Sequence, residues 1–271
     1  MTQDAWVTTH PYLQSLSSLH LQVETAVAEM STFSPSAPSW NNYIGDFLAG
    51  VPLLRSSAVA IDFAPVERMV RLLVERLASS HLSGNVADQA RILKAELGRD
   101  LDARCCVAAW LLDNTVFAST CPGLLRYLGW TVLSRCLRPL VNAFGRWREE
   151  ESWLRSYCPT CGSPPAMAQL LGADPGRRRF LSCGCCGTRW QYRRTTCPFC
   201  ENGENHRLAV LTVEGEGGLR IDYCESCKGY LKTYVGEGSE TVLLADWTSI
   251  HLDVIACDRG LRRLAVSLYE L

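Results

Sequence analysis

The chain has 271 residues, of which 47% are hydrophobic and 20% are charged, and its formal net charge is −1. This composition is typical of a globular protein, and the length is sufficient for two domains with hydrophobic cores. The near-neutral charge argues against a nucleic-acid partner. No run of about 18 apolar residues predicts a membrane span. Because residues 1–6 have neither the basic nor the apolar region of a secretory signal, we expect a cytoplasmic protein.

The first 155 residues are predicted to form an all-α helical bundle. Apolar residues recur three and four apart from Val66 to Leu77, from Val86 to Leu97 and from Leu101 to Phe117, which is the spacing of one buried helix face. A further apolar helix is expected to begin at Pro122 and to run through Phe144. This half contains no recognisable catalytic motif.

The 14 cysteines need an explanation other than disulfides in a reducing cytosol, and metal ligation is the usual one. Eight of them form four Cys-x-x-Cys pairs, which are Cys158/Cys161, Cys183/Cys186, Cys197/Cys200 and Cys224/Cys227. Two such pairs complete a tetrahedral site of four thiolates, the geometry of structural zinc or of a single iron. Because four cysteines leave no position open for water or substrate, these sites indicate a protein that is not an enzyme.

Internal repetition indicates which pairs share a site. Cys158-Pro-Thr-Cys161 matches Cys197-Pro-Phe-Cys200 at an offset of 39, and Cys183/Cys186 matches Cys224/Cys227 at an offset of 41. The repeat predicts one module written twice, over residues 156–196 and 197–240, with short strands at 207–213, 219–223 and 230–235. It favours sequential pairing of the cysteine pairs, although a nested pairing of 183/186 with 197/200 stays open. Residues 241–271 regain a helical period.

The remaining cysteines have simpler interpretations. Cys185 aligns with Ser226 in the repeat, so a small residue in a turn is favoured over a spare ligand. Core packing is the expectation for the others because cysteine is among the most buried residue types; these are Cys105, Cys106, Cys121, Cys136 and Cys257.

Arginines lie close to aromatic residues in the first module. Arg177–Arg179 and Arg193–Arg194 flank Trp190 and Tyr192, which is a combination found in nucleic-acid footprints. A solvated strand face is the simpler interpretation and is favoured.

The four cysteine pairs lie within longer motifs. These are Tyr157-Cys-Pro-Thr-Cys-Gly-Ser-Pro164, Leu181-Ser-Cys-Gly-Cys-Cys-Gly-Thr-Arg-Trp190, Arg194-Thr-Thr-Cys-Pro-Phe-Cys200 and Tyr223-Cys-Glu-Ser-Cys-Lys-Gly-Tyr-Leu-Lys232. The stretch Leu244–Asp253 follows them, and Gly50–Leu54 is a weaker point of agreement in the first half. In this order they resemble the FdhE family of formate dehydrogenase accessory proteins, over roughly residues 157–255.

The resemblance implies a cytoplasmic accessory factor that is required to form active formate dehydrogenase and that binds its catalytic subunit during maturation. It also implies two rubredoxin-like sites, in which the eight paired cysteines would each serve as a ligand and iron would be the metal, with zinc as the alternative. The expected fold is therefore α+β: a helical bundle, two tandem rubredoxin-like or zinc-ribbon modules, and a C-terminal helical segment. A dependence on redox state would follow if the metal is iron.

Two other functions remain open from the residues alone. One is a zinc-ribbon protein that binds nucleic acid through the arginine stripe, and the other is a rubredoxin-like electron-transfer protein. The sequence leaves open the choice between iron and zinc, because both accept four thiolates. It also leaves open the partner-binding surface and the oligomeric state.

Overall fold

The computed structural model describes residues 1–30, 35–80, 85–99, 107, 111–112, 119–216 and 218–269. The chain divides into two units. The first comprises Met1–Pro11, Ser39–Ser57 and Gly145–Ser267, and the second comprises Tyr12–Pro38, Ala58–Phe144 and Leu268–Leu271. The sequence-based division into residues 1–155, 156–196, 197–240 and 241–271 stays a prediction.

The second unit is built from helices in its described part. These are α2 (Gln14–Glu29), α4 (Ala64–Ala78), α5 (Val86–Arg99) and most of α7 (Pro122–Trp147). The helices predicted at 66–77, 86–97 and 122–144 are confirmed. The helix predicted at 101–117 falls mostly outside the described residues.

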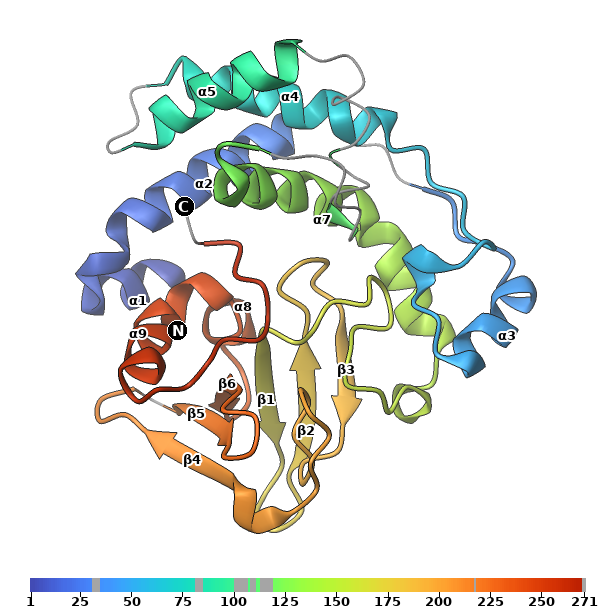
Figure 1. Ribbon diagram of the computed structural model, residues 1–271, viewed down its shortest axis with the longest axis vertical. Helices are drawn as coiled ribbons and strands as arrows, with labels where there is room; N and C mark the ends of the chain where they lie inside the picture. The colour runs from blue at the N-terminus through green and yellow to red at the C-terminus, as the bar shows by residue number, and fades with distance from the viewer. Residues whose placement is uncertain are drawn as a thin grey trace. The chain divides into compact units, whose positions relative to one another are not determined.

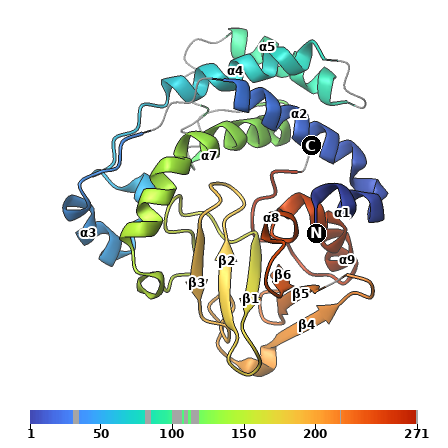
Figure 2. The same cartoon turned by 180° about the vertical axis from the view of Figure 1, so that it is seen from behind.

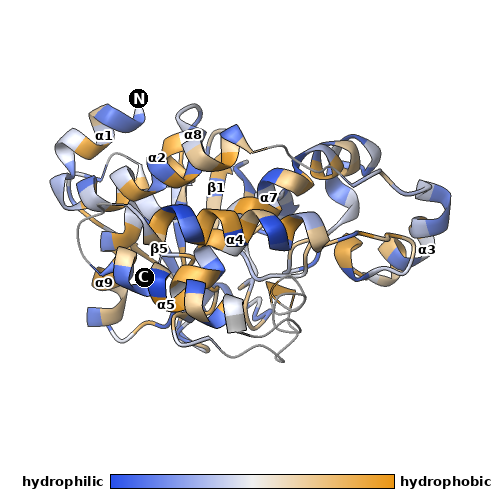
Figure 3. Ribbon diagram, turned by 90° about the horizontal axis from the view of Figure 1, so that it is seen from above, coloured by the Kyte–Doolittle hydropathy of each residue, from blue (hydrophilic) through white to orange (hydrophobic). Residues whose placement is uncertain are grey.

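The packing of α4 follows from its apolar period. Buried side chains recur three and four residues apart along it, and they are Val66, Met69, Val70, Leu73, Val74 and Leu77. Figure 3 shows the result as alternating hydrophobic and hydrophilic bands along α4. Most of the stability of such a helix comes from burial of this face against its neighbours rather than from intrinsic propensity.

The cysteine-rich half of the chain forms, within its described residues, a six-stranded sheet in the order β3-β2-β1-β6-β5-β4. The strands are β1 (Met167–Leu171), β2 (Arg178–Ser182), β3 (Arg189–Tyr192), β4 (Leu208–Thr212), β5 (Leu219–Cys224) and β6 (Tyr230–Val235). The three strands predicted in the second module are confirmed. Figure 2 shows β1, β2 and β3 side by side.

The sheet consists of two antiparallel halves that are joined in parallel. Strands β1–β3 form one half and β4–β6 the other, and β1 pairs with β6 from Met167↔Lys232 to Leu170↔Val235. The two joining strands are buried along nearly their whole length, whereas β4 at the edge is half exposed. The predicted module is therefore present twice, and the first strand of one copy pairs with the last strand of the other.

The C-terminal segment packs near the sheet within the first unit (Figure 1). It contains α8 (Glu240–Leu243), the 3₁₀ helix η6 (Asp246–Ser249) and α9 (Ile250–Asp258), so the predicted helical segment is confirmed as far as Asp258, whereas residues 259–269 are not helical. The first unit also contains α1 (Gln3–Thr9) and α3 (Trp40–Ala49). The indole N–H of Trp6 in α1 donates to the carbonyl of Thr248 at 2.9 Å, which ties α1 to η6.

Candidate metal centres

The first thiol cluster contains the four cysteines that sequential pairing predicts. The Sγ atoms of Cys158 and Cys186 are 3.5 Å apart, those of Cys161 and Cys183 are also 3.5 Å apart, and all four lie within 4.8 Å of one another. Four sulfurs at about 2.3 Å from a tetrahedral ion lie about 3.8 Å from one another. The cluster therefore has the donors and the dimensions for one ion.

The second cluster has the same construction. The Sγ atoms of Cys197 and Cys227 are 3.8 Å apart, those of Cys200 and Cys224 are 3.7 Å apart, and all four lie within 4.8 Å of one another. The structure thus groups the thiols sequentially and not in the nested arrangement. The choice between iron and zinc is not decided by this geometry, because four thiolates suit both.

The two clusters differ in their access to solvent. All four cysteines of the first are buried, whereas Cys200 in the second is exposed and Cys227 is partly exposed. Each Cys-x-x-Cys turn is called a knuckle. The first knuckle, Cys158–Cys161, is covered by residues 50–55, because the N–H groups of Leu53 and Leu54 donate to the carbonyls of Pro159 and Thr160 at 2.9 and 2.8 Å. This contact gives a structural role to the Gly50–Leu54 stretch.

Hydroxyl groups surround only the thiols of the first cluster among the contacts of the described residues. The Oγ1 atoms of Thr160 and Thr188 lie 2.7 Å apart, and Thr188 Oγ1 lies 3.1 Å from Cys186 Sγ. The repeat places Phe199 and Gly229 at the corresponding positions of the second module. The first cluster is therefore enclosed by side-chain contacts that the second cannot form.

Backbone N–H groups point at the sulfurs in both clusters. The N–H groups of Cys185, Phe199 and Gly229 lie 3.3–3.4 Å from the Sγ atom two residues earlier. Burial opposes ionisation of Cys224, but hydrogen bonds from the backbone of Cys227 and Ser226 lower the pKa of its thiol to about 7. Since metals bind the thiolate form, these hydrogen bonds favour ligation at Cys224, whereas burial raises the pKa of the Cys197 and Cys227 thiols despite their backbone hydrogen bonds.

Each knuckle ends with a residue in the left-handed region. The residue after the second cysteine has φ +83° at Gly162, +72° at Gly187, 58° at Glu201 and 57° at Lys228. The first module uses glycine for this conformation, and the second accepts side chains there. In the fourth Cys-x-x-Cys turn the left-handed residue, Lys228, directly precedes Gly229, whose N–H points at Cys227 Sγ.

The other cysteines fall into three groups. Cys185 is buried and outside the first cluster, as the repeat predicted, and Cys121 and Cys136 are buried as expected. The expectation for Cys257 was wrong, because the thiol lies on the exposed side of α9. The prediction for Cys105 and Cys106 falls outside the described residues.

The arginine stripe is interrupted by burial. Trp190 is fully buried and its indole N–H donates to the carbonyl of Arg155 at 3.0 Å, so its ring cannot stack on a base. Arg179 is also buried, with its guanidinium donating to the carbonyls of Arg193 and Thr196. These contacts remove the main support for a nucleic-acid interface.

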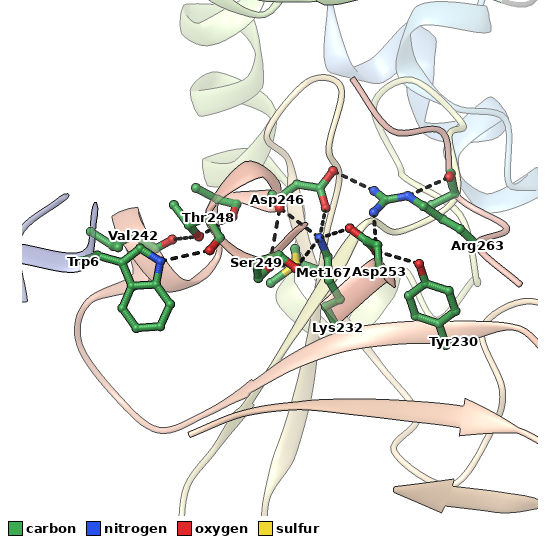
Figure 4. Close-up of polar contacts among 12 residues, drawn as sticks. Trp6, Met167, Tyr230, Lys232, Val242, Asp246, Thr248, Ser249, Asp253 and Arg263 are labelled. Atoms are coloured by element: carbon green, nitrogen blue, oxygen red, sulfur yellow. Dashed lines mark hydrogen bonds and ion pairs between the residues drawn. The ribbon is translucent and has the colours of Figure 1, made fainter. Parts of the chain in front are cut away.

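A buried charge cluster was not found from the sequence. The ammonium of Lys232 in β6 is 1% exposed and lies 2.6 Å from a carboxylate oxygen of Asp246 and 2.8 Å from one of Asp253 (Figure 4). Arg263 bridges the same two carboxylates at 2.6 and 2.8 Å, and the hydroxyl of Tyr230 donates to Asp253 at 2.6 Å. Two cations and two anions balance, which is what burial of charge requires.

The charge cluster connects two of the motifs that carry the family resemblance. Lys232 ends the fourth cysteine motif, and Asp246 and Asp253 belong to Leu244–Asp253. Although burial opposes it, the charges of Lys232 and Arg263 lower the pKa of Asp246. The sequence signal for this site was a lysine in a largely apolar central strand, because a buried ammonium requires a partner of opposite charge.

A small pocket borders the second thiol cluster. Its volume is about 150 Å³, and its wall includes Phe199, Leu208 and Leu231 together with Arg194 and Arg220. The pocket thus combines apolar side chains with guanidinium groups and the carboxylate of Asp222, next to the more exposed of the two clusters.

A helical unit and a sheet with two four-cysteine clusters are consistent with a protein that carries tandem zinc-ribbon or rubredoxin-like modules. Residues 157–194 match the family model described as FdhE, central domain. The chain is 37% identical over 128 residues to the FdhE homolog of Pseudomonas aeruginosa, and 33% identical over 115 residues to that of Aquifex aeolicus. It is 29% identical over 143 residues to protein FdhE of Escherichia coli (strain K12 / DH10B).

These matches cover 44%, 41% and 51% of this chain, and they span 40%, 41% and 45% of the length of the relatives. The fold is similar to the crystal structure of the FdhE protein from P. aeruginosa, with a TM-score of 0.62 over 95% of this chain and 88% of that chain, at 23% identity. The resemblance to FdhE proteins is therefore confirmed. In the part of the chain that the structure describes, no helix combines the length and apolar character needed to cross a bilayer.

The left-handed turn can be tested without altering a thiol. We predict that Gly187→Ala lowers the free energy of unfolding by about 1 kcal/mol, because a Cβ is unfavourable at this φ. A Cβ at Gly187 would meet nothing within 4 Å, so the loss isolates the backbone conformation. The control is Gly203→Ala, which is equally open but outside the left-handed region. Equal effects of the two substitutions in denaturant melts would contradict the interpretation.

The buried ammonium can be tested by removing its charge. We predict that Lys232→Met destabilises the fold by about 3–5 kcal/mol, because it leaves the buried Asp246 and the partly buried Asp253 with one cation. Lys228→Met serves as control, since Lys228 is half exposed and pairs with Glu225 on the surface. Chemical denaturation should show a far smaller loss for the control. A Lys232→Met protein as stable as the wild type would show that the cluster contributes little.

Proposed function

We propose that this protein is a cytoplasmic accessory factor that is required to form active formate dehydrogenase and that binds the catalytic subunit of that enzyme during maturation. The observation that carries the proposal is the ordered set of four cysteine pairs. The first two pairs lie in residues 157–194, which match the FdhE central domain, and the chain is similar to relatives named FdhE. A fold similar to that of an FdhE crystal structure supports it. The four predicted segments, 1–155, 156–196, 197–240 and 241–271, are kept as part of this proposal.

Each thiol cluster is proposed to hold one metal ion. The ligands would be Cys158, Cys161, Cys183 and Cys186 in the first site and Cys197, Cys200, Cys224 and Cys227 in the second. The metal would be iron, as the resemblance implies, with zinc as the alternative. When bound, such an ion supplies cross-linking of the small modules and, if it is iron, a one-electron couple. Because all four donors are protein thiolates, we propose a role in binding rather than in catalysis.

The unequal exposure of the two thiol clusters supports a different role for each. The buried first site is suited to stabilise the sheet, and the second site is more exposed, with the pocket of apolar and charged side chains beside it. A partner that docks over this face would contact the second module and sense the state of its ion. This arrangement would make recognition of the catalytic subunit dependent on redox state if the ion is iron.

The dependence on the clusters can be tested by co-purification. Tagged protein is expressed with the formate dehydrogenase catalytic subunit, and the recovered subunit is quantified for wild type and for Cys158→Ser combined with Cys197→Ser. We predict a loss of at least about tenfold in recovered subunit, because apo modules of this size lose about 10–16 kcal/mol of apparent stabilisation. Cys185→Ser is the matched control, since Cys185 is buried beside the first cluster but outside it. Undiminished recovery with both clusters disrupted would contradict a metal-dependent interaction.

The identity of the metal is tested on anaerobically purified protein. We predict two irons per chain and thiolate-to-iron charge-transfer bands in the visible spectrum. Two zincs and a colourless protein would contradict the proposed redox dependence and the electron-transfer alternative, but would leave a structural role for the clusters. Treatment with a chelator should unfold the modules in either case, which circular dichroism would report.

A further inference from the structure

Three side chains that are typical metal ligands converge away from the cysteines. His10 is the C-cap residue of α1, Glu216 lies between β4 and β5, and His251 is in the first turn of α9. One ligand atom from each lies within 4.8 Å of the other two. All three belong to the first unit, in which α1 and α9 lie next to each other in Figures 1 and 2. More than 200 residues separate His10 from the other two, so only the tertiary structure assembles them.

The distances suit coordination. The Nε2 atom of His251 lies 2.9 Å from Glu216 Oε1, and the Nε2 atom of His10 lies 3.5 Å from the same oxygen. Ligand atoms at about 2.1 Å from one ion lie about 3.0–3.4 Å apart in tetrahedral or octahedral geometry. The exposed fractions of the three side chains are 12%, 11% and 16% for His10, Glu216 and His251. The cluster is therefore shielded but still within reach of an ion from solvent.

The ring of His10 is oriented by its surroundings. Its Nδ1 atom lies 2.9 Å from the carbonyl oxygen of Trp6 and 3.0 Å from the hydroxyl of Thr9. A carbonyl can only accept, so the tautomer that satisfies the contact with Trp6 has its proton on Nδ1. This leaves Nε2 directed at Glu216. The indole of Trp6 stacks on the imidazole at 3.9 Å and is itself held by its bond to Thr248. Ligating histidines commonly donate their other N–H to a carbonyl in this way.

The charge of the cluster also favours a cation. Two imidazole nitrogens face one carboxylate oxygen, and this contact is attractive only if a proton or a metal ion lies between the groups. Glu216 Oε2 is also buried and lacks a hydrogen-bond partner among the described residues.

We propose that His10, Glu216 and His251 form a third metal site, which binds a divalent transition-metal ion such as Zn²⁺ or Fe²⁺. Two imidazoles and one carboxylate are donors that these ions accept, and they differ from the soft thiolates of the cysteine clusters. The site joins α1, the β4–β5 connection and α9. Three protein ligands leave at least one coordination position for water or for a donor atom from another molecule.

The test uses the full chain and Co²⁺ as the probe, because Co²⁺ reports its ligands spectroscopically. Thiolate-to-cobalt charge transfer marks the cysteine clusters, whereas nitrogen and oxygen ligands give only weaker ligand-field bands. We expect the wild type to bind one equivalent beyond the two thiolate sites, with no added charge transfer. Glu216→Gln should weaken this equivalent by at least about tenfold. Glu214→Gln, an exposed carboxylate of the same connection, should leave it unchanged.

Several outcomes would overturn the proposal. They are the absence of a further equivalent in the wild type, a further equivalent that Glu216→Gln does not weaken, or one that adds thiolate charge transfer. The thiolate bands report folding of the variant; if Glu216→Gln loses them, His10→Gln carries the same expectation. A readout without any variant is the histidine ring ¹⁵N spectrum during Zn²⁺ addition, in which two of the five histidines should shift at Nε2. Unchanged histidine resonances at saturating Zn²⁺ would also overturn it.

Discussion

The buried ammonium of Lys232 is the constraint on which the cysteine-rich unit depends. It lies on β6, one of the two central strands, and a cation at that depth must be matched by carboxylates. Asp246 and Asp253 supply them, which fixes η6 and α9 near the sheet, and Arg263 restores neutrality (Figure 4). Because η6 also accepts the indole N–H of Trp6, the position of α1 follows from the same contact. Segments from both ends of the chain are thereby organised around one charge.

A single sheet joins the two modules, whose thiol clusters differ in exposure. Pairing of β1 with β6 in parallel joins the first strand of one copy to the last strand of the other, so the repeat is head to tail. The first copy is closed by residues 50–55 and by the Thr160 and Thr188 hydroxyls, and its thiols are buried. The second copy lacks these covers and has an exposed thiol and a neighbouring pocket. A duplicated sequence has therefore become one buried cluster and one more exposed cluster, which is consistent with the proposed role in which one site stabilises the fold and the other faces a partner.

The candidate sites differ in donor chemistry, and this difference distinguishes the roles proposed for them. The cysteine clusters offer four soft thiolates with no open position, which suits cross-linking and electron storage. The cluster of His10, Glu216 and His251 offers nitrogen and oxygen donors from three separate elements and leaves a position open. An ion bound there would link α1 near the N-terminus to α9 near the C-terminus. It would do so close to the contacts that Lys232 organises, so the two features would reinforce each other.

The sequence by itself determined the local features. The helices at 66–77, 86–97 and 122–144, the strands of the second module, the sequential thiol clusters and the place of Cys185 outside them all follow from short-range periodicity and from a repeat with fixed offsets. Tertiary structure alone decided the parallel pairing of β1 with β6, the burial of Trp190, the exposure of Cys257, the partners of Lys232 and the meeting of His10 with His251. The physical reason is the distance along the chain over which each feature is specified. A hydrophobic period or a Cys-x-x-Cys turn is specified by neighbours along the chain, whereas a buried charge or a convergent ligand set depends on which distant segments pack together.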